Sequence, residues 1–192
     1  MICAVALVLL LDASASVGAA DWDLQLAGHA AAFEGEDVAR ITAREPVAVT
    51  AFGFSEQAAP LVGWRVIQGG ADARAFAAEL RGADRGVPQG TDIGGALFAG
   101  LRALGAAPCA PDWAVLDLVT DGEAPAEPAR RARAYAEVQG VRINAIGVGS
   151  ESAVAWLREN AVTPSGFVMA ASDWHDVARA LRSKITLELA AR

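Results

Sequence analysis

The sequence predicts an α/β fold: a doubly wound, mainly parallel six-stranded sheet with one antiparallel edge strand and helices on both faces. Three observations lead to this fold. Apolar runs alternate with helical patterns along the 192 residues. The first run, Cys3–Leu11, is continuously apolar, as expected of a strand buried on both faces. Strand–helix alternation of this kind favours a parallel sheet whose connections pass over both of its faces.

The first third of the chain supplies a strand, a helical region and a hairpin. Cys3–Leu11 is the first expected strand, and Asp21–Ile41 follows with an irregular but mainly helical pattern. Pro46–Phe54 and Leu61–Ile67 are the second and third expected strands. The short segment Ser55–Pro60 between them indicates a hairpin, so this pair is expected to be antiparallel.

The rest of the chain continues the alternation, and glycines such as Gly82 and Gly140 mark the ends of helices. The remaining expected strands are Trp113–Thr120, Val141–Val148 and Phe167–Ala170. The expected helices are Asp72–Leu80, Asp92–Leu104, Glu127–Val138, Glu151–Asn160 and the long amphipathic Asp173–Leu189. The chain length fits one domain, 1–192, and leaves little room for a second.

Composition excludes several classes of protein. Hydrophobic residues make up 54% and charged residues 20% of the chain, which permits a sizeable core and disfavours disorder. The formal net charge of −7 disfavours a nucleic-acid partner, because an acidic surface repels phosphate backbones. The apolar run at the start is too short to span a bilayer, so no transmembrane segment is expected.

The compartment depends on how this first run is interpreted. The small residues of Ala13–Ala20 resemble a signal-peptidase site, but no Lys or Arg precedes the apolar run to form the basic region of a signal peptide. We interpret the run as a buried strand, and the sequence as it stands as cytoplasmic. A leader upstream of Met1 would make the protein periplasmic or secreted.

Two cysteines, Cys3 and Cys109, are too few for a disulfide framework and lack the spacing of metal ligands. The favoured interpretation is a pair of buried free thiols. A single bridge stays open as the alternative, because both cysteines are expected near the amino ends of neighbouring strands.

Three segments carry oxygen-bearing side chains to one edge of the expected sheet. Asp12, Ser14 and Ser16 alternate where the first strand ends, Thr91 lies between a loop and a helix, and Asp121 ends a later strand. Ligands of such sheets bind outside the carboxyl ends of the strands, at the point where the strand order reverses. At a strand tip, Asp12 should point out of the sheet, so Asp12→Ala should change the stability of the metal-free protein by less than about 1 kcal/mol.

Two carboxylates and three hydroxyls form a hard, all-oxygen set of ligands. This chemistry suits Mg²⁺ or Mn²⁺ and also tolerates Ca²⁺. The set contains no His or Cys, so zinc is disfavoured.

The Asp-x-Ser-x-Ser, Thr and Thr-Asp-Gly segments resemble the metal-ion-dependent adhesion site of von Willebrand factor type A domains, which have a Rossmann-like fold. The resemblance covers essentially the whole chain. It implies that the hydroxyls of Ser14, Ser16 and Thr91 bind the metal, and that Asp12 and Asp121 bind it directly or through water. The Gly-Thr-Asp-Ile-Gly-Gly-Ala-Leu segment and the last helix resemble a bacterial group of stand-alone A domains of uncharacterised function. Ala15 departs from the glycine that members often carry, and it requires ordinary backbone angles there.

Other polar residues are interpreted as structural. Asp21 and Asp92 are expected to begin helices. His29 and His175 have no Ser or Cys partner in a recognisable catalytic arrangement. The Gly147-Val-Gly149 turn lacks the third glycine of a dinucleotide-binding loop.

The resemblance and the charge of the site favour protein binding. Two formal negative charges leave a dication partly positive, so a carboxylate from a protein partner can complete its coordination. The alternative is a metal-assisted hydrolase or phosphotransferase that uses the same cation. An enzyme needs a general base and a group that stabilises the leaving atom, and the sequence shows neither near the site. We therefore expect a binding module and not an enzyme.

Overall fold

The computed structural model describes residues 2–190, so the ends of the expected domain, Met1 and 191–192, lie outside the described residues. Its six strands form one sheet in the order β3-β2-β1-β4-β5-β6. The strands are β1 (Ile2–Asp12), β2 (Val47–Phe54), β3 (Ala58–Ile67), β4 (Ala110–Thr120), β5 (Arg142–Val148) and β6 (Val168–Ala171). The strands are parallel except β3, which runs antiparallel to β2, so the expected hairpin and edge strand are confirmed.

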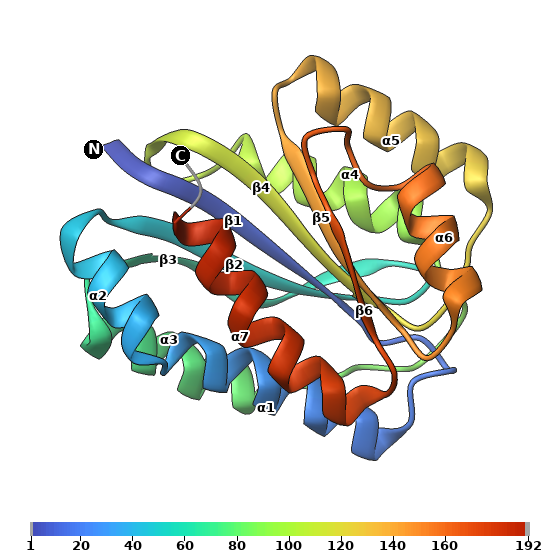
Figure 1. Ribbon diagram of the computed structural model, residues 1–192, viewed down its shortest axis with the longest axis horizontal. Helices are drawn as coiled ribbons and strands as arrows, with labels where there is room; N and C mark the ends of the chain where they lie inside the picture. Colours follow the sequence, from blue (N-terminus) through green and yellow to red (C-terminus); the bar gives the residue numbers. More distant parts are fainter. Residues whose placement is uncertain (1, 191–192) are drawn as a thin grey trace.

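The helices divide between the two faces of the sheet (Figure 1). The first face carries α1 (Ala19–Phe33), α2 (Glu36–Arg44), α3 (Gly70–Arg81) and α7 (Trp174–Ala190), which share one apolar core with the sheet. The second face carries α4 (Ile93–Leu104), α5 (Ala126–Val138) and α6 (Glu151–Asn160), which build a second core. Between Ile2 and Ala190, no helix is both long and apolar enough to cross a membrane.

Strand β1 lies at the centre of the sheet. It pairs in parallel with β2 on one side and with β4 on the other. Its odd-numbered residues Val5, Leu7, Leu9 and Leu11 enter the first core, and Val8 and Leu10 enter the second. This double burial explains why the run is continuously apolar, because both faces of the strand must exclude water.

The helical region expected over Asp21–Ile41 is two helices. Helix α1 ends at Phe33, and Gly35 takes an extended conformation (φ −63°, ψ 145°) before α2 begins. An extended residue ends the run of helical hydrogen bonds, so the chain changes direction between the two helices.

Two glycines at the start of α4 allow close packing that a side chain would prevent. A Cβ atom on Gly94 would lie 2.5 Å from Pro128 of α5, and one on Gly95 would lie 2.3 Å from the carboxylate of Asp92. Asp92 uses that space to cap α4, accepting a hydrogen bond of 2.8 Å from the backbone N–H of Gly95. The expectation that Asp92 begins a helix is therefore confirmed.

The favoured interpretation of the cysteines is wrong, because Cys3 and Cys109 form a disulfide. Cys3 is the second residue of β1, and Cys109 directly precedes β4. The register pairs Ile2 with Ala110 and so brings the two Cα atoms to 5.9 Å, within reach of a bridge. The bridge therefore ties together the amino ends of two neighbouring parallel strands.

We predict that this disulfide makes a large contribution to stability. It joins residues 106 positions apart, and closing a loop of that length in the unfolded chain is worth about 2–5 kcal/mol. Urea unfolding with and without a phosphine reductant should show a free energy of unfolding lower by that amount in the reduced protein. The Cys3→Ala/Cys109→Ala double variant should not respond to the reductant. Equal midpoints for oxidised and fully reduced wild type would refute the prediction.

Candidate metal centre

The parallel pairing of β1 and β4 places the first and third predicted segments side by side. Leu11 lies opposite Val119, so the next residues along the two strands, Asp12 and Thr120, are neighbours at the carboxyl edge of the sheet. The loops that begin there carry Ser14 and Ser16 on one side and Asp121 on the other. The site thus forms where the chain turns from β1 toward β2 in one direction and from β4 toward β5 in the other.

Asp12 is fully buried, so the expectation that it points out into solvent is wrong. One carboxylate oxygen accepts a hydrogen bond of 2.8 Å from the backbone N–H of Ser14, and the other accepts one of 2.5 Å from the hydroxyl of Thr120. The side-chain amide of Gln25 on α1 donates to the Asp12 carbonyl at 2.9 Å. Burial raises the pKa of Asp12, although the hydrogen bonds from Ser14 and Thr120 act in the opposite direction.

The two serines link Asp12 to Asp121. The hydroxyl oxygens of Ser14 and Ser16 lie 3.1 Å apart, and the Ser16 hydroxyl donates to Asp121 at 2.8 Å. Ser14 is buried and Ser16 is exposed, so this row of oxygens runs from the interior to the surface. Asp121 contributes a second negative charge that also raises the pKa of Asp12, as the smallest of its causes.

Thr91 reaches the same edge from the loop before α4. A Cβ atom on Gly122 would lie 3.9 Å from the Thr91 hydroxyl oxygen, so this hydroxyl faces the residue that follows Asp121. The loop is held in place by the backbone N–H of Asp92, which donates to the Ser55 carbonyl at 2.8 Å. All five predicted residues therefore lie at one edge. Their binding of a metal stays a prediction.

Arg85 holds the loop that carries the serines, and the sequence analysis did not find it. Its guanidinium donates to the backbone carbonyls of Ala13 (3.3 Å), Ser14 (2.5 Å) and Val17, and it also lies over the ring of Trp22. A lone arginine in a Gly/Pro loop has no local pattern that would mark it.

The same loop makes a second contact, because the Gln89 carbonyl accepts from the backbone N–H of Ala15. Ala15 keeps ordinary backbone angles, since no residue other than glycine between 2 and 190 has a positive φ. The loop that precedes Thr91 thus fixes the conformation of the loop that carries Ser14 and Ser16.

Neither histidine takes part in the site. His29 is buried within α1, and its Nδ1 lies 2.8 Å from the Gln25 carbonyl, while His175 is exposed beside Asp173. Asp21 lies in the first turn of α1, as expected of a residue that begins a helix.

The five predicted side chains fit a hard divalent cation, because all their donor atoms are oxygens and because hydrogen bonds already hold these oxygens close together. No group of three or more His, Cys, Asp or Glu side chains that could hold a metal occurs within residues 2–190. The predicted set differs from such a group, because three of its five donors are hydroxyls. Its oxygens are already held close together by hydrogen bonds, so a cation would need little rearrangement of the loop.

Comparison with known protein families assigns this chain to one of them. The profile of the family described as "Protein of unknown function (DUF1194)" matches residues 2–192. The chain belongs to this family. A search of curated protein sequences finds no match.

Solved structures show the fold of this family member to be that of von Willebrand factor type A domains. A von Willebrand factor type A structure from Catenulispora acidiphila superposes with a TM-score of 0.70 at 22% identity, over 97% of this chain and 43% of that one. BatB from Bacteroides thetaiotaomicron superposes with a TM-score of 0.64 at 17% identity, over 98% of this chain and all of the other (100%).

A third structure is proximal thread matrix protein 1 of the mussel byssus, with zinc in its metal-ion-dependent adhesion site (MIDAS) motif. It superposes with a TM-score of 0.65 at 17% identity, over 97% of this chain and 46% of that one. This chain thus spans less than half of the mussel and Catenulispora proteins.

We predict that Asp12→Ala lowers the stability of the metal-free protein by about 1–3 kcal/mol, because it leaves the buried Ser14 N–H and the Thr120 hydroxyl without an acceptor. Asp12→Asn keeps one acceptor oxygen and should cost less. Urea unfolding in EDTA measures both, with Asp23→Ala, an exposed aspartate on α1, as the control. A loss no larger than that of the control would show that the buried hydrogen bonds add nothing.

We predict that Arg85→Gln weakens the binding of the divalent metal by about 10–100-fold, because residues that orient metal ligands have effects of this size. Calorimetric titration with Mn²⁺ measures the change, and Arg131→Gln on the exposed side of α5 is the control. Arg85→Lys should restore part of the affinity, since one ammonium can still donate to a loop carbonyl. Unchanged affinity in a folded Arg85→Gln variant would exclude this role.

Proposed function

We propose that the protein is a divalent-metal-dependent protein-binding module in which Asp12, Ser14, Ser16, Thr91 and Asp121 hold Mg²⁺ or Mn²⁺. The metal would bridge to a carboxylate of the partner. The observation that carries the proposal is the hydrogen-bonded row from Asp12 through the serines to Asp121, which ends at the surface of the sheet edge.

Charge explains why such a site favours binding an acidic group. Asp12 and Asp121 together carry two negative charges, and the hydroxyls are neutral, so these donors do not surround a bound dication with excess negative charge. A dication in this setting attracts a further carboxylate oxygen from outside. Arg85, Gln25 and Thr120 hold the oxygens of the proposed site in place through their hydrogen bonds.

A hydrolase or phosphotransferase using the same cation is the weaker candidate. Such an enzyme needs a base beside the reacting atom. His29 is buried within α1, and the chain's only lysine, Lys184, is buried in the core. Asp12 and Asp121 already belong to the proposed metal site, and the Asp92 carboxylate caps α4. We therefore propose a binding role and no catalysis.

The disulfide bears on the compartment. Disulfides persist in oxidising surroundings and are rare in the cytosol, where thiols are kept reduced. The Cys3–Cys109 bridge therefore favours a periplasmic or extracellular location over the cytoplasmic one expected from the sequence. We also propose that residues 1–192 form a single A domain.

The metal can be tested without a known partner. A cation that binds only the folded state raises the free energy of unfolding, by about 2.7 kcal/mol at a hundred times its dissociation constant. Each of Mg²⁺, Mn²⁺, Ca²⁺ and Zn²⁺ is added in turn, and the metal that binds should raise the Tm of wild type more than it raises the Tm of Asp121→Asn. If none of the four cations shifts the Tm at millimolar concentration, the metal site is refuted.

The binding role needs a second readout. Proteins captured by the immobilised domain in Mg²⁺ should be released by EDTA and should not bind an Asp12→Asn variant of confirmed fold. Assays with phosphate and carboxylate esters should show no turnover above background. Turnover that requires both the metal and Asp121 would favour the enzyme instead.

A further inference from the structure

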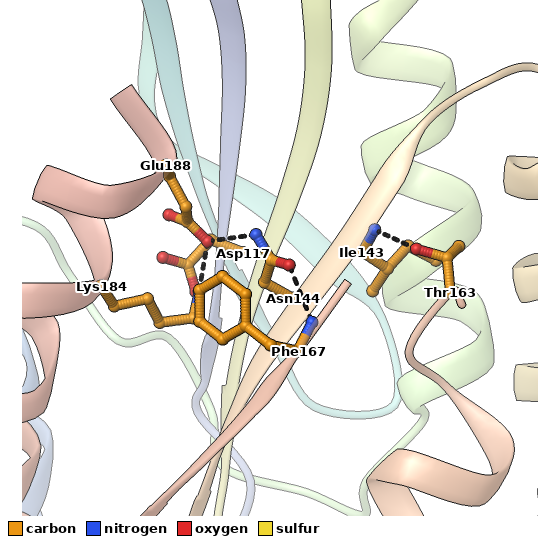
Figure 2. A network of polar contacts seen from close by, with 7 residues as sticks. All are labelled: Asp117, Ile143, Asn144, Thr163, Phe167, Lys184 and Glu188. Carbon is orange, nitrogen blue, oxygen red and sulfur yellow. Dashed lines mark hydrogen bonds and ion pairs between the residues drawn. The ribbon is translucent and has the colours of Figure 1, made fainter. Parts of the chain in front are cut away.

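A cluster of ionisable groups, none of them part of the proposed metal site, lies in the core beneath α7. Figure 2 shows Lys184 and Glu188 reaching from α7 toward Asp117 on β4 and Asn144 on β5. Lys184, Asp117 and Glu188 are all inaccessible to solvent or nearly so, with exposures of 0%, 0% and 2%. Isolated charges at such depth are strongly unfavourable, so the cluster must neutralise itself.

The ammonium of Lys184 contacts both carboxyls. It forms an ion pair with Asp117, and it donates to Glu188 Oε1 at 2.6 Å. The side-chain amide of Asn144 donates to the same oxygen at 2.8 Å, and Asn144 is held by the backbone N–H of Phe167 (Figure 2). Lys184 also lies 5.8 Å from the centre of the Phe167 ring.

The charges do not balance if all three groups are ionised. Two carboxylates and one ammonium leave one negative charge without a partner in the core. The other oxygen of Glu188, Oε2, and Asp117 Oδ2 have no hydrogen-bond partner, although both carboxyls contact the Lys184 ammonium. An ionised carboxylate only accepts hydrogen bonds, whereas a protonated one also donates, so a proton on one of the two carboxyls would cancel the excess charge and supply a donor.

We propose that Asp117, Lys184 and Glu188 form a buried proton-binding site that fastens α7 to the sheet and weakens its attachment when the proton is lost. The two carboxyls share the proton beside the ammonium, so the cluster has no net charge. Loss of the proton leaves a buried negative charge, which is relieved when the last turns of α7 separate from the sheet and admit water.

The other charged groups around the cluster do not supply the missing charge. His29 on α1 interacts with Asp117, but its Nδ1 already donates to a carbonyl, and burial lowers the pKa of the ring, so it stays neutral. Arg142 on β5 lies over the Trp113 ring. Arg40, Arg44 and Glu45 line a pocket with Leu189 and Ala190 at the end of α7, and Arg40 is paired with Asp37.

The pKa of Glu188 sets the pH range. Burial and the nearby Asp117 raise it from 4.5 to about 8, against the opposite effect of Lys184. Between these values the folded protein keeps a proton that the unfolded chain has lost, so unfolding releases one proton. The stabilisation is complete below the unfolded pKa and is lost as the pH rises toward 8.

The test is the pH dependence of unfolding in wild type and in Glu188→Gln, which replaces the protonated acid by a neutral group of similar shape. Between pH 6.5 and 8, the unfolding constant of wild type should rise about tenfold per pH unit relative to the variant. Glu159→Gln, an exposed residue of α6, should follow wild type. Parallel profiles for wild type and Glu188→Gln would overturn the proposal. So would a pH dependence that vanishes in His29→Gln and persists in Glu188→Gln.

Two measurements on wild type test the proposal even if Glu188→Gln does not fold. Unfolding at pH 7 in weakly buffered urea should release one proton more than the other groups account for, and no release would refute the site. Lys184 is the only lysine, so its acetylation, measured by mass spectrometry relative to the unfolded chain, reports separation of α7. Its protection should fall about tenfold per pH unit between pH 6.5 and 8 and level off above pH 8. Constant protection from pH 6.5 to 8 would refute the release of α7.

Discussion

The parallel pairing of β1 with β4 is the constraint on which the rest of this structure depends. These strands are adjacent in the sheet but more than a hundred residues apart in sequence, and their register aligns both ends. At the amino ends, the register makes the Cys3–Cys109 bridge feasible. At the carboxyl ends, it brings Thr120 onto Asp12 and Ser16 onto Asp121. A shift of one residue would turn the side chains of a whole strand to the opposite face and dissolve both arrangements.

The acidic residues of β1 and β4 illustrate how depth changes what a carboxylate can do. Asp12 is buried but lies at a strand end, where backbone N–H groups and hydroxyls are close enough to satisfy it. Asp117 lies in the middle of β4, where the backbone is already used by the sheet, so only side chains from α7 can offset its charge. The first setting leaves oxygens that can serve a cation from outside, and the second keeps its cation within the chain.

Much of the fold and the location of the site could be predicted from the sequence, because both follow from local patterns. Apolar runs identify the strands, and helix α6 has the bounds that its pattern indicates. Features that depend on packing at a distance could not be predicted in this way. The burial of Asp12 and the reach of Arg85 across the metal-site loop depend on how loops fold over the sheet. The spacing of Lys184 and Glu188 does match the apolar face of α7, since Leu181 and Ile185 lie one turn away, but charged residues at such positions are usually at the margin of a face.

The position of the disulfide has a mechanical consequence. The described ends of the chain, Ile2 and Ala190, lie at the amino edge of the sheet, whereas the proposed metal site lies at the carboxyl edge (Figure 1). A partner pulling on the metal while the N-terminal end of the chain is anchored would load β1 along its length. The share of the force that enters through Asp121 would pass from β4 to β1 through their hydrogen bonds, which would bear it in shear, all together and not one after another. The bridge at the start of β1 stops that strand from sliding past β4, so tension would have to break the site before it could unravel the sheet beneath it.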